Sequence, residues 1–351
     1  MTLDFYGAAV IGQRSEQQDS ALVLELSGGR RLFLVADGMG GHNGGREASE
    51  MVCQTFRHYF EADPSAAEQP SSLRAALILA NNRLAETSRR QPEMFGMGST
   101  VVALIIDEET GLFNFLSVGD SPLYQWKGGQ LRRLNEDHSL RSDLLREVMA
   151  GRMSPEDAAC HPDRNVLKSA VFGQMISLID EKAGVLAVGE RLILASDGLQ
   201  TLDDSPQGQV AWLLGQATAP YEAVNGLFEA LAAAGNPYQD NATVLIAGRT
   251  AQPESVLADY GQAVSGFEVI ESPGGFLNWQ GPFGLTGHRL ARLGVILLVI
   301  IFAALTVLAL IRLITGEMPG FFADFKGPVF CEMSLSSWLN KMDSIKGGIG
   351  G

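Results

Sequence analysis

The stretch "RLFLVADGMGGHNGG", residues 31–45, decides how the rest of the chain is interpreted. Its apolar run from Leu32 to Ala36 predicts a short buried β-strand. The run stops at Asp37, and glycines follow at positions 38, 40, 41, 44 and 45. Asp-Gly is also an ordinary turn pair, so this stretch alone leaves open both a simple turn and a functional carboxylate.

Four other aspartates occur in a similar setting. Asp197 ends the apolar run "RLILASD", and Asp120 ends "FNFLSVGD". Asp240 opens the run "DNATVLI", and Asp19 lies between two expected strands. Five carboxylates brought together at strand ends would repel one another, so such a cluster requires a cation. Oxygen ligands favour Mg²⁺ or Mn²⁺, and no Cys/His spacing suggests zinc.

The order of the expected elements predicts an α+β fold. Strands are expected at 5–11, 20–26, 31–36, 98–107, 111–121, 122–134, 191–198 and 241–248, and helices at 45–61, 72–89, 139–151, 154–160, 207–217 and 220–234. The turn sequences "DEETG" and "KGG" mark hairpins and therefore antiparallel neighbours. Runs of strands with helices in pairs indicate a four-layer α-β-β-α sandwich, two antiparallel sheets flanked by helix pairs.

Charge and cysteine content restrict the class of protein. The chain of 351 residues has a net charge of −14, which argues against nucleic acid as a partner because phosphate backbones attract basic surfaces. A protein surface or a small molecule fits better. Its three cysteines, Cys53, Cys160 and Cys331, form no pair or metal spacing, as expected in a reducing compartment.

One segment predicts a membrane anchor. Residues 293–311, "LGVILLVIIFAALTVLALI", contain no charge, and a helix of this length spans a hydrocarbon core of ~30 Å. We therefore expect one C-terminal transmembrane helix. Basic residues before the span and the absence of an N-terminal secretion signal favour a catalytic domain on the cytoplasmic side of the membrane.

These observations predict four regions. Residues 1–249 form the catalytic domain, 250–287 a linker rich in Gly, Pro, Ser and Gln, 288–312 the membrane helix with its basic flank, and 313–351 a short extracytoplasmic tail. We find no internal repeat.

Taken in order, several motifs resemble one known family. The segments "RSEQQD", "VADGMGGH", "GST", "SVGDS", "NEDHS", "HPDRNVLKSAVFG", "LILASDGL" and "QDNATV" look like those of the metal-dependent Ser/Thr protein phosphatases of the protein phosphatase 2C family, bacterial type. The resemblance covers residues 5–248 and implies the same sandwich fold.

The resemblance also implies a role for each site residue. Asp37 would bridge two divalent ions, Mn²⁺ or Mg²⁺, and the Gly38 carbonyl would complete one coordination sphere. Asp197 and Asp240 would ligate one ion, and Asp19 would hold the other through water. Asp120 would share a third, weaker ion with Asp197. Arg14 would bind the substrate phosphate, because its planar guanidinium can contact two phosphate oxygens at once.

The implied reaction is hydrolysis of phosphoserine or phosphothreonine by a metal-bridging hydroxide, in opposition to a Ser/Thr kinase at the membrane.

The chain departs from the family at Gln17, in place of asparagine, and at Met39, where some members have a histidine proposed as general acid. His42 could protonate the leaving oxygen instead or serve the loop structurally. His138 and His161 are interpreted as structural. The alternative function is a pseudophosphatase that binds phosphoproteins as a regulator.

Overall fold

The structure is a computed structural model that describes residues 2–40, 44–250 and the backbone of 268–270. The chain divides into two units, 1–287 and 288–351, and all described residues belong to the first. The predicted membrane span therefore lies outside the described residues. Among the helices that are described, none has the length and apolar character needed to cross a membrane.

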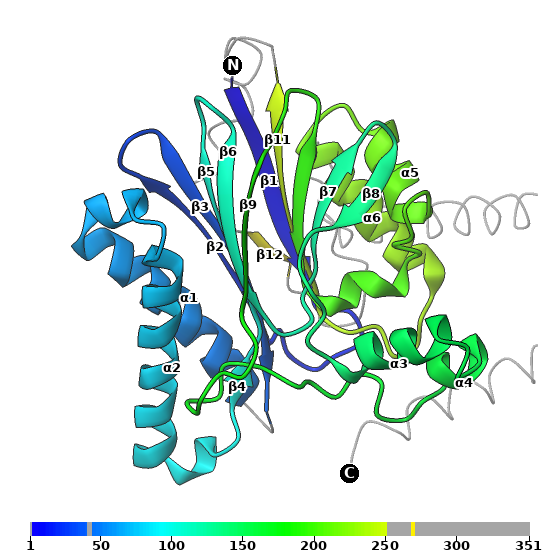
Figure 1. Ribbon diagram of the computed structural model, residues 1–351, viewed down its shortest axis with the longest axis horizontal. Helices are drawn as coiled ribbons and strands as arrows, with labels where there is room; N and C mark the ends of the chain where they lie inside the picture. Colours follow the sequence, from blue (N-terminus) through cyan, green and yellow to red (C-terminus); the bar gives the residue numbers. More distant parts are fainter. Residues whose placement is uncertain (1, 41–43, 251–267, 271–351) are drawn as a thin grey trace, which may run out of the picture. The chain divides into compact units, whose positions relative to one another are not determined.

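Two sheets form the centre of the described unit (Figure 1). The first has the order β12-β1-β11-β10-β7-β8, with bounds Glu268–Ile270, Thr2–Val10, Ala242–Thr250, Arg191–Ala195, Leu123–Lys127 and Gln130–Arg133. The second has the order β2-β3-β5-β6-β9, with bounds Asp19–Leu26, Arg30–Met39, Val101–Asp107, Leu112–Val118 and Asp180–Val185, and β4 (Gly98–Ser99) pairs with β3.

Paired helices cover the outer faces of the sheets. Helices α1 (Gly44–Ala62) and α2 (Ser72–Arg90) pack on the second sheet, and α5 (Gln209–Gln216) and α6 (Pro220–Ala234) pack on the first. Helices α3 (Leu140–Met149) and α4 (Pro155–Ala159) lie between β8 and β9 in the chain. Short 3₁₀ helices are η1 (Pro64–Glu68), η2 (Pro92–Met94) and η3 (Asp197–Thr201).

The four layers enclose three buried apolar clusters, one for each interface between layers. Strand β3 shows how the sequence produces them. Leu32, Leu34 and Ala36 face the α1–α2 layer, whereas Phe33 and Val35 face the other sheet. A strand covered on both faces needs apolar residues at every position, which explains the unbroken run at 32–36. The predicted four-layer sandwich is confirmed.

The strand predicted at 191–198 ends at Ala195, because the 3₁₀ helix η3 begins at Asp197, and the strand predicted at 98–107 is divided into β4 and β5. The structure also contains two strands where none was predicted. Strand β12 lies within the predicted linker and pairs with β1 in parallel, so the first sheet is not fully antiparallel. Strand β9 was not predicted, because it is an edge strand whose sequence "DEKAGV" is largely exposed and lacks an apolar run. Helix α4, predicted at 154–160, has a capping residue before its first turn: the Ser154 hydroxyl accepts a hydrogen bond from the Asp157 amide (3.0 Å).

Strand register brings the functional strand ends to one end of the sandwich. In the second sheet Asp19 pairs with Asp37 across β2 and β3. In the first sheet Ala195 of β10 pairs with Val244 of β11, so the residues just after β10 and just before β11 lie together. The antiparallel arrangement thus places the predicted aspartates next to one another.

Candidate metal centre

The five predicted aspartates share one electrostatic environment. The pKa of Asp37 is raised well above its ordinary value by burial and then by the charges of Asp19, Asp197, Asp120 and Asp240. Burial and then the charge of Asp240 raise the pKa of Asp197. Like charges act on one another at this strength only when they are close together. The other four carboxylates therefore lie within electrostatic reach of Asp37, and their role as metal ligands stays a prediction.

The five side chains differ in exposure. Asp19 and Asp120 are buried, whereas Asp37, Asp197 and Asp240 remain partly open to solvent. One oxygen of Asp19, Oδ2, accepts hydrogen bonds from the hydroxyls of Ser196 and Thr243, both at 2.7 Å. The three partly exposed carboxylates can contact a ligand directly, whereas the buried Asp19 carboxylate is fixed by its hydrogen bonds to Ser196 and Thr243.

Asp37 is held by the backbone and side chain of Thr100. The Asp37 amide donates to the Thr100 hydroxyl (3.0 Å), and the Thr100 amide donates to the Asp37 carbonyl (2.8 Å). The next residue, Gly38, lies so close to Gly45 that a Cβ at Gly38 would stand 2.0 Å from the Gly45 carbonyl oxygen. The Asp-Gly pair therefore serves close backbone packing as well as presentation of the carboxylate.

Arg14 lies beside the cluster. Its Nη2 forms an ion pair with Asp240 Oδ2 at 2.5 Å, and the arginine side chain is 58% exposed. The pKa of Arg14 is raised by this hydrogen bond and by the charges of Asp240, Asp197 and Asp37. A guanidinium has five N–H donors, so donors remain for an anion approaching from solvent.

The loop that carries Arg14 is fastened to the start of β11 by Asn241. The side-chain nitrogen of Asn241, Nδ2, donates to the carbonyls of Ile11 (2.8 Å) and Glu16 (3.1 Å). Its side-chain oxygen, Oδ1, accepts a hydrogen bond from the backbone amide of Gln18 (2.8 Å). Gln17, where the family that the sequence resembles has asparagine, is buried, and its side-chain oxygen accepts a hydrogen bond from the Asp19 amide (3.0 Å). Both side chains fix the backbone on either side of the cluster.

Asp120 follows β6 at the rear of the cluster. Burial and then the charge of Asp197 raise the pKa of Asp120 to about 7. Its carbonyl accepts a hydrogen bond from Arg133 Nη2 (2.7 Å).

The donor set fits hard divalent cations. All five side chains are carboxylates, and their mutual repulsion is the condition that a bound cation relieves. In the part of the chain that the structure describes, no group of three or more His, Cys, Asp or Glu side chains has the arrangement of a ready-made metal site. Mg²⁺ keeps several water ligands and needs only one or two carboxylates, which this open arrangement supplies.

The predicted roles of the histidines have different outcomes. His42 lies outside the described residues, so both of its predicted roles stay open. His138 is buried; its ring Nδ1 accepts from the Gly119 amide (3.2 Å), and its own amide donates to the Gly119 carbonyl (3.1 Å). Burial lowers the pKa of His138, which keeps the ring neutral. These contacts agree with the structural interpretation of His138.

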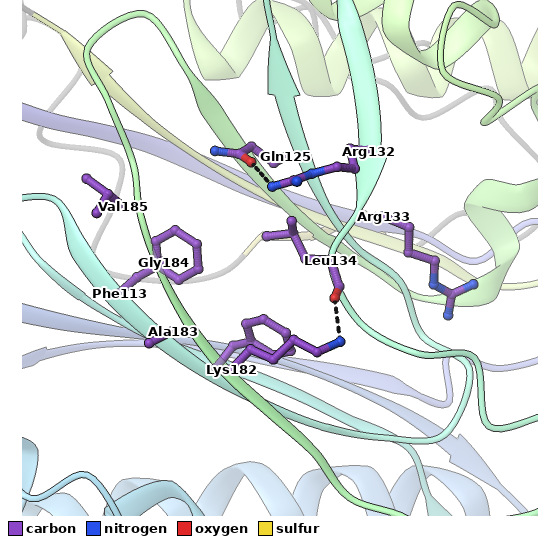
Figure 2. Close-up of a pocket in the computed structure, with 10 residues that line it drawn as sticks. Phe113, Gln125, Arg132, Arg133, Leu134, Lys182, Ala183, Gly184 and Val185 are labelled. Carbon is purple, nitrogen blue, oxygen red and sulfur yellow. Dashed lines mark hydrogen bonds between the residues drawn. The ribbon is translucent and has the colours of Figure 1, made fainter.

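A pocket of about 280 Å³ lies elsewhere, between the two sheets (Figure 2). Its lining includes Phe113, Arg132 and Lys182 but no acidic side chain. Arg132 donates to Gln125 (2.8 Å), and Lys182 donates to the Leu134 carbonyl (3.3 Å). This pocket therefore offers no site for a divalent cation, and the acidic cluster is the better candidate.

Several supporting residues were missed by sequence reasoning: Thr100, Ser196, Asn241, Thr243 and Arg141. Each acts by contact with a residue far away in the sequence, as in the bond from Thr243 to Asp19. The motif segments "GST", "LILASDGL" and "QDNATV" contained all of them except Arg141, and this was the available signal.

We predict that the metal-free protein has a pH-dependent stability governed by these carboxyls. The pKa of Asp19 rises from 3.8 to about 7, chiefly because the carboxyl is buried. Between these values the native state binds more protons than the unfolded chain, so the free energy of unfolding falls as pH rises. Thermal unfolding in EDTA from pH 5 to pH 8 should therefore show Asp19→Asn gaining stability relative to wild type toward pH 8.

The wild-type pH dependence alone does not isolate Asp19, because His138 has the opposite effect: its lowered pKa makes the free energy of unfolding rise with pH. The difference between wild type and Asp19→Asn removes the contribution of His138. Asp203→Asn is the matched control, since hydrogen bonds from Ser205 lower the pKa of this exposed carboxyl. It should show no such gain. An Asp19→Asn difference that is constant from pH 5 to pH 8 would contradict the prediction.

Comparison with known proteins identifies relatives of the chain. The family model described as Protein phosphatase 2C matches residues 6–243. The serine/threonine protein phosphatase PstP of Mycobacterium tuberculosis is 31% identical over 252 residues, which cover 71% of this chain and 44% of that relative. The chain thus matches less than half the length of this relative.

Solved structures show the same fold. A crystal structure of Mycobacterium tuberculosis PstP/Ppp is similar with a TM-score of 0.61 and 28% identity, covering 71% of this chain and 100% of that one. The catalytic domain of PstP in complex with two manganese ions is similar with a TM-score of 0.56 and 27% identity, covering 70% of this chain and 98% of that one. With the family model matched over most of the chain and the acidic cluster in place, the chain belongs to the protein phosphatase 2C family.

Proposed function

We propose that the protein is a metal-dependent phosphatase acting on phosphoserine and phosphothreonine in proteins. The observation that carries the proposal is the set of five aspartates gathered at one end of the sandwich beside a solvent-exposed arginine. The match to Protein phosphatase 2C, and relatives named as serine/threonine phosphatases, support it. The relative in complex with two manganese ions supports Mn²⁺ or the similar Mg²⁺ as cofactor.

Each residue of the centre has a distinct task in this proposal. Asp37, Asp197 and Asp240 would hold two divalent ions, with Asp19 behind them and Asp120 at the rear. When bound, such ions lower the pKa of water and stabilise negative charge on a phosphoryl group. Arg14 binds the phosphate from the solvent side and offsets charge that develops on its oxygens. Thr100, Ser196 and Thr243 keep the carboxylates oriented.

Turnover of a phosphopeptide should require divalent cations. We expect the full chain to release phosphate from a phosphothreonine peptide with Mn²⁺ or Mg²⁺ but not with EDTA. Asp37→Asn and Asp197→Asn should each lower the rate by about 100-fold or more, because each removes a charged ligand of the ions. Phosphate release measured with malachite green provides the assay.

Asp203→Asn, an exposed carboxyl outside the cluster, is the control and should keep wild-type activity. A folded wild-type chain with no turnover on any divalent ion would refute the enzyme and favour the pseudophosphatase, which binds phosphoproteins without hydrolysing them.

A separate prediction concerns Arg14. Replacing it by alanine should raise KM for the phosphopeptide and lower kcat/KM about 10- to 100-fold, since hydrogen bonds to charged groups contribute ~1.5–3 kcal/mol. Arg14→Lys should recover part of the loss, because a lysine keeps the charge but not the two-donor geometry. Unchanged steady-state kinetics in Arg14→Ala would exclude contact with phosphate.

We also propose that the protein is a single-pass protein of the cytoplasmic membrane, with the catalytic domain facing the cytoplasm and opposing a Ser/Thr kinase there. The uncharged segment 293–311 supports this proposal. Tethering would raise the effective concentration of the phosphatase near membrane-bound substrates.

The anchor predicts resistance to extraction. The full chain should stay with membranes in alkaline carbonate, whereas a chain ending at residue 287 should be released into the supernatant. Replacing Leu297 and Leu305 by arginine should have the same effect, because charges at the centre of a span are unfavourable. Release of the intact full chain by carbonate would contradict the anchor.

A further inference from the structure

An arginine outside the predicted site lies close to the metal centre. Arg141 is in the first turn of α3, and its guanidinium donates to Gln200 and to Asn165 (2.9 Å to the latter). Gln200 belongs to η3, the 3₁₀ helix that begins at Asp197. The guanidinium is therefore fastened to the short segment that presents one of the metal-site carboxylates.

The backbone just before Arg141 is fastened to the other side of the same region. His138 exchanges two hydrogen bonds with Gly119, the residue before Asp120. The Arg141 amide donates to the Arg164 carbonyl (2.9 Å), which fixes the start of α3. Arg141 is thus held between the segment of Asp120 and that of Asp197.

Electrostatics agree with this placement. The charge of Arg141 acts to lower the pKa of both Asp120 and Asp197, against the larger effect of burial. Arg133 has this effect on Asp120, and Arg14 has it on Asp197. Arg141 is thus among the largest influences on both carboxyls of the pair.

The positive charge of Arg141 is not consumed by a close ion pair. Its two side-chain partners, Gln200 and Asn165, are neutral amides. Among the described residues, no carboxylate lies within ion-pair distance of it. A fixed charge with neutral partners remains available to the acidic pair, and it repels any further cation that approaches there.

We propose that Arg141 supplies, beside Asp120 and Asp197, the positive charge that a third divalent ion would otherwise supply, so that the centre of this chain holds two ions. The inference rests on the proposed function. It assigns to a residue of the chain a charge that the family resemblance would assign to a weak third ion. Arg141 is a positioning residue in this proposal and does not contact the reacting atoms.

The test counts bound Mn²⁺ by the electron paramagnetic resonance signal of free Mn²⁺ during titration of the full chain. Wild type should bind two ions. Arg141→Gln, which keeps hydrogen-bonding capacity without charge, should bind three, and adding Asp120→Asn should return the count to two. Arg141→Lys keeps the charge and should bind two. Arg146→Gln is the matched control on α3, because Arg146 is exposed and paired with Asp143, and it should also bind two.

Three ions in wild type, or two in a folded Arg141→Gln, would overturn the inference. A raised KM for the phosphopeptide with the count unchanged at two would assign Arg141 to substrate contact and would overturn it as well. The count does not depend on turnover. Wild type that binds two ions without hydrolysing the peptide would refute the proposed phosphatase, while a third ion in Arg141→Gln would still support this inference.

Discussion

The repulsion among five carboxylates is the constraint on which the rest of the centre depends. Each unit by which a pKa is raised corresponds to ~1.4 kcal/mol against the ionised form, and four of these aspartates have raised pKa values. A fold that holds such a cluster in place must be stabilised elsewhere. The three apolar interfaces of the sandwich provide that stability. The carboxylates are therefore held at the end of a rigid core, where a bound cation would relieve their repulsion.

In each central strand the middle residues fill the core and the residues at one end form the centre. The middle of β3 is apolar on both faces, and its last residues carry Asp37 and Gly38. Strands β10 and β11 are built in the same way, with Asp197 after one and Asp240 before the other. Antiparallel pairing makes these ends coincide, so the same register that fills the core also assembles the centre.

Neutral side chains around the carboxylates determine which oxygens remain free. Ser196 and Thr243 both donate to one oxygen of Asp19, and Thr100 contacts the backbone of Asp37 on both sides. Asn241 ties the Arg14 loop to the strand that follows Asp240. These bonds restrict the carboxylates and the arginine before any ligand arrives, which reduces the entropy lost on binding. Arg141 extends this support to the rear of the centre.

By itself the sequence determined the strands with two buried faces, the flanking helices, the five aspartates and Arg14, because apolar runs and strand-end carboxylates are local signals. It missed the edge strand β9, which has no apolar run, and the parallel pairing of β12, which depends on a distant strand. Only the tertiary structure decided that Asp19 faces Asp37 and that Arg141 lies near Asp120 and Asp197. Such contacts join residues up to 230 positions apart, as between Asn241 and Ile11, and a local pattern carries no information about which distant side chain completes a hydrogen bond.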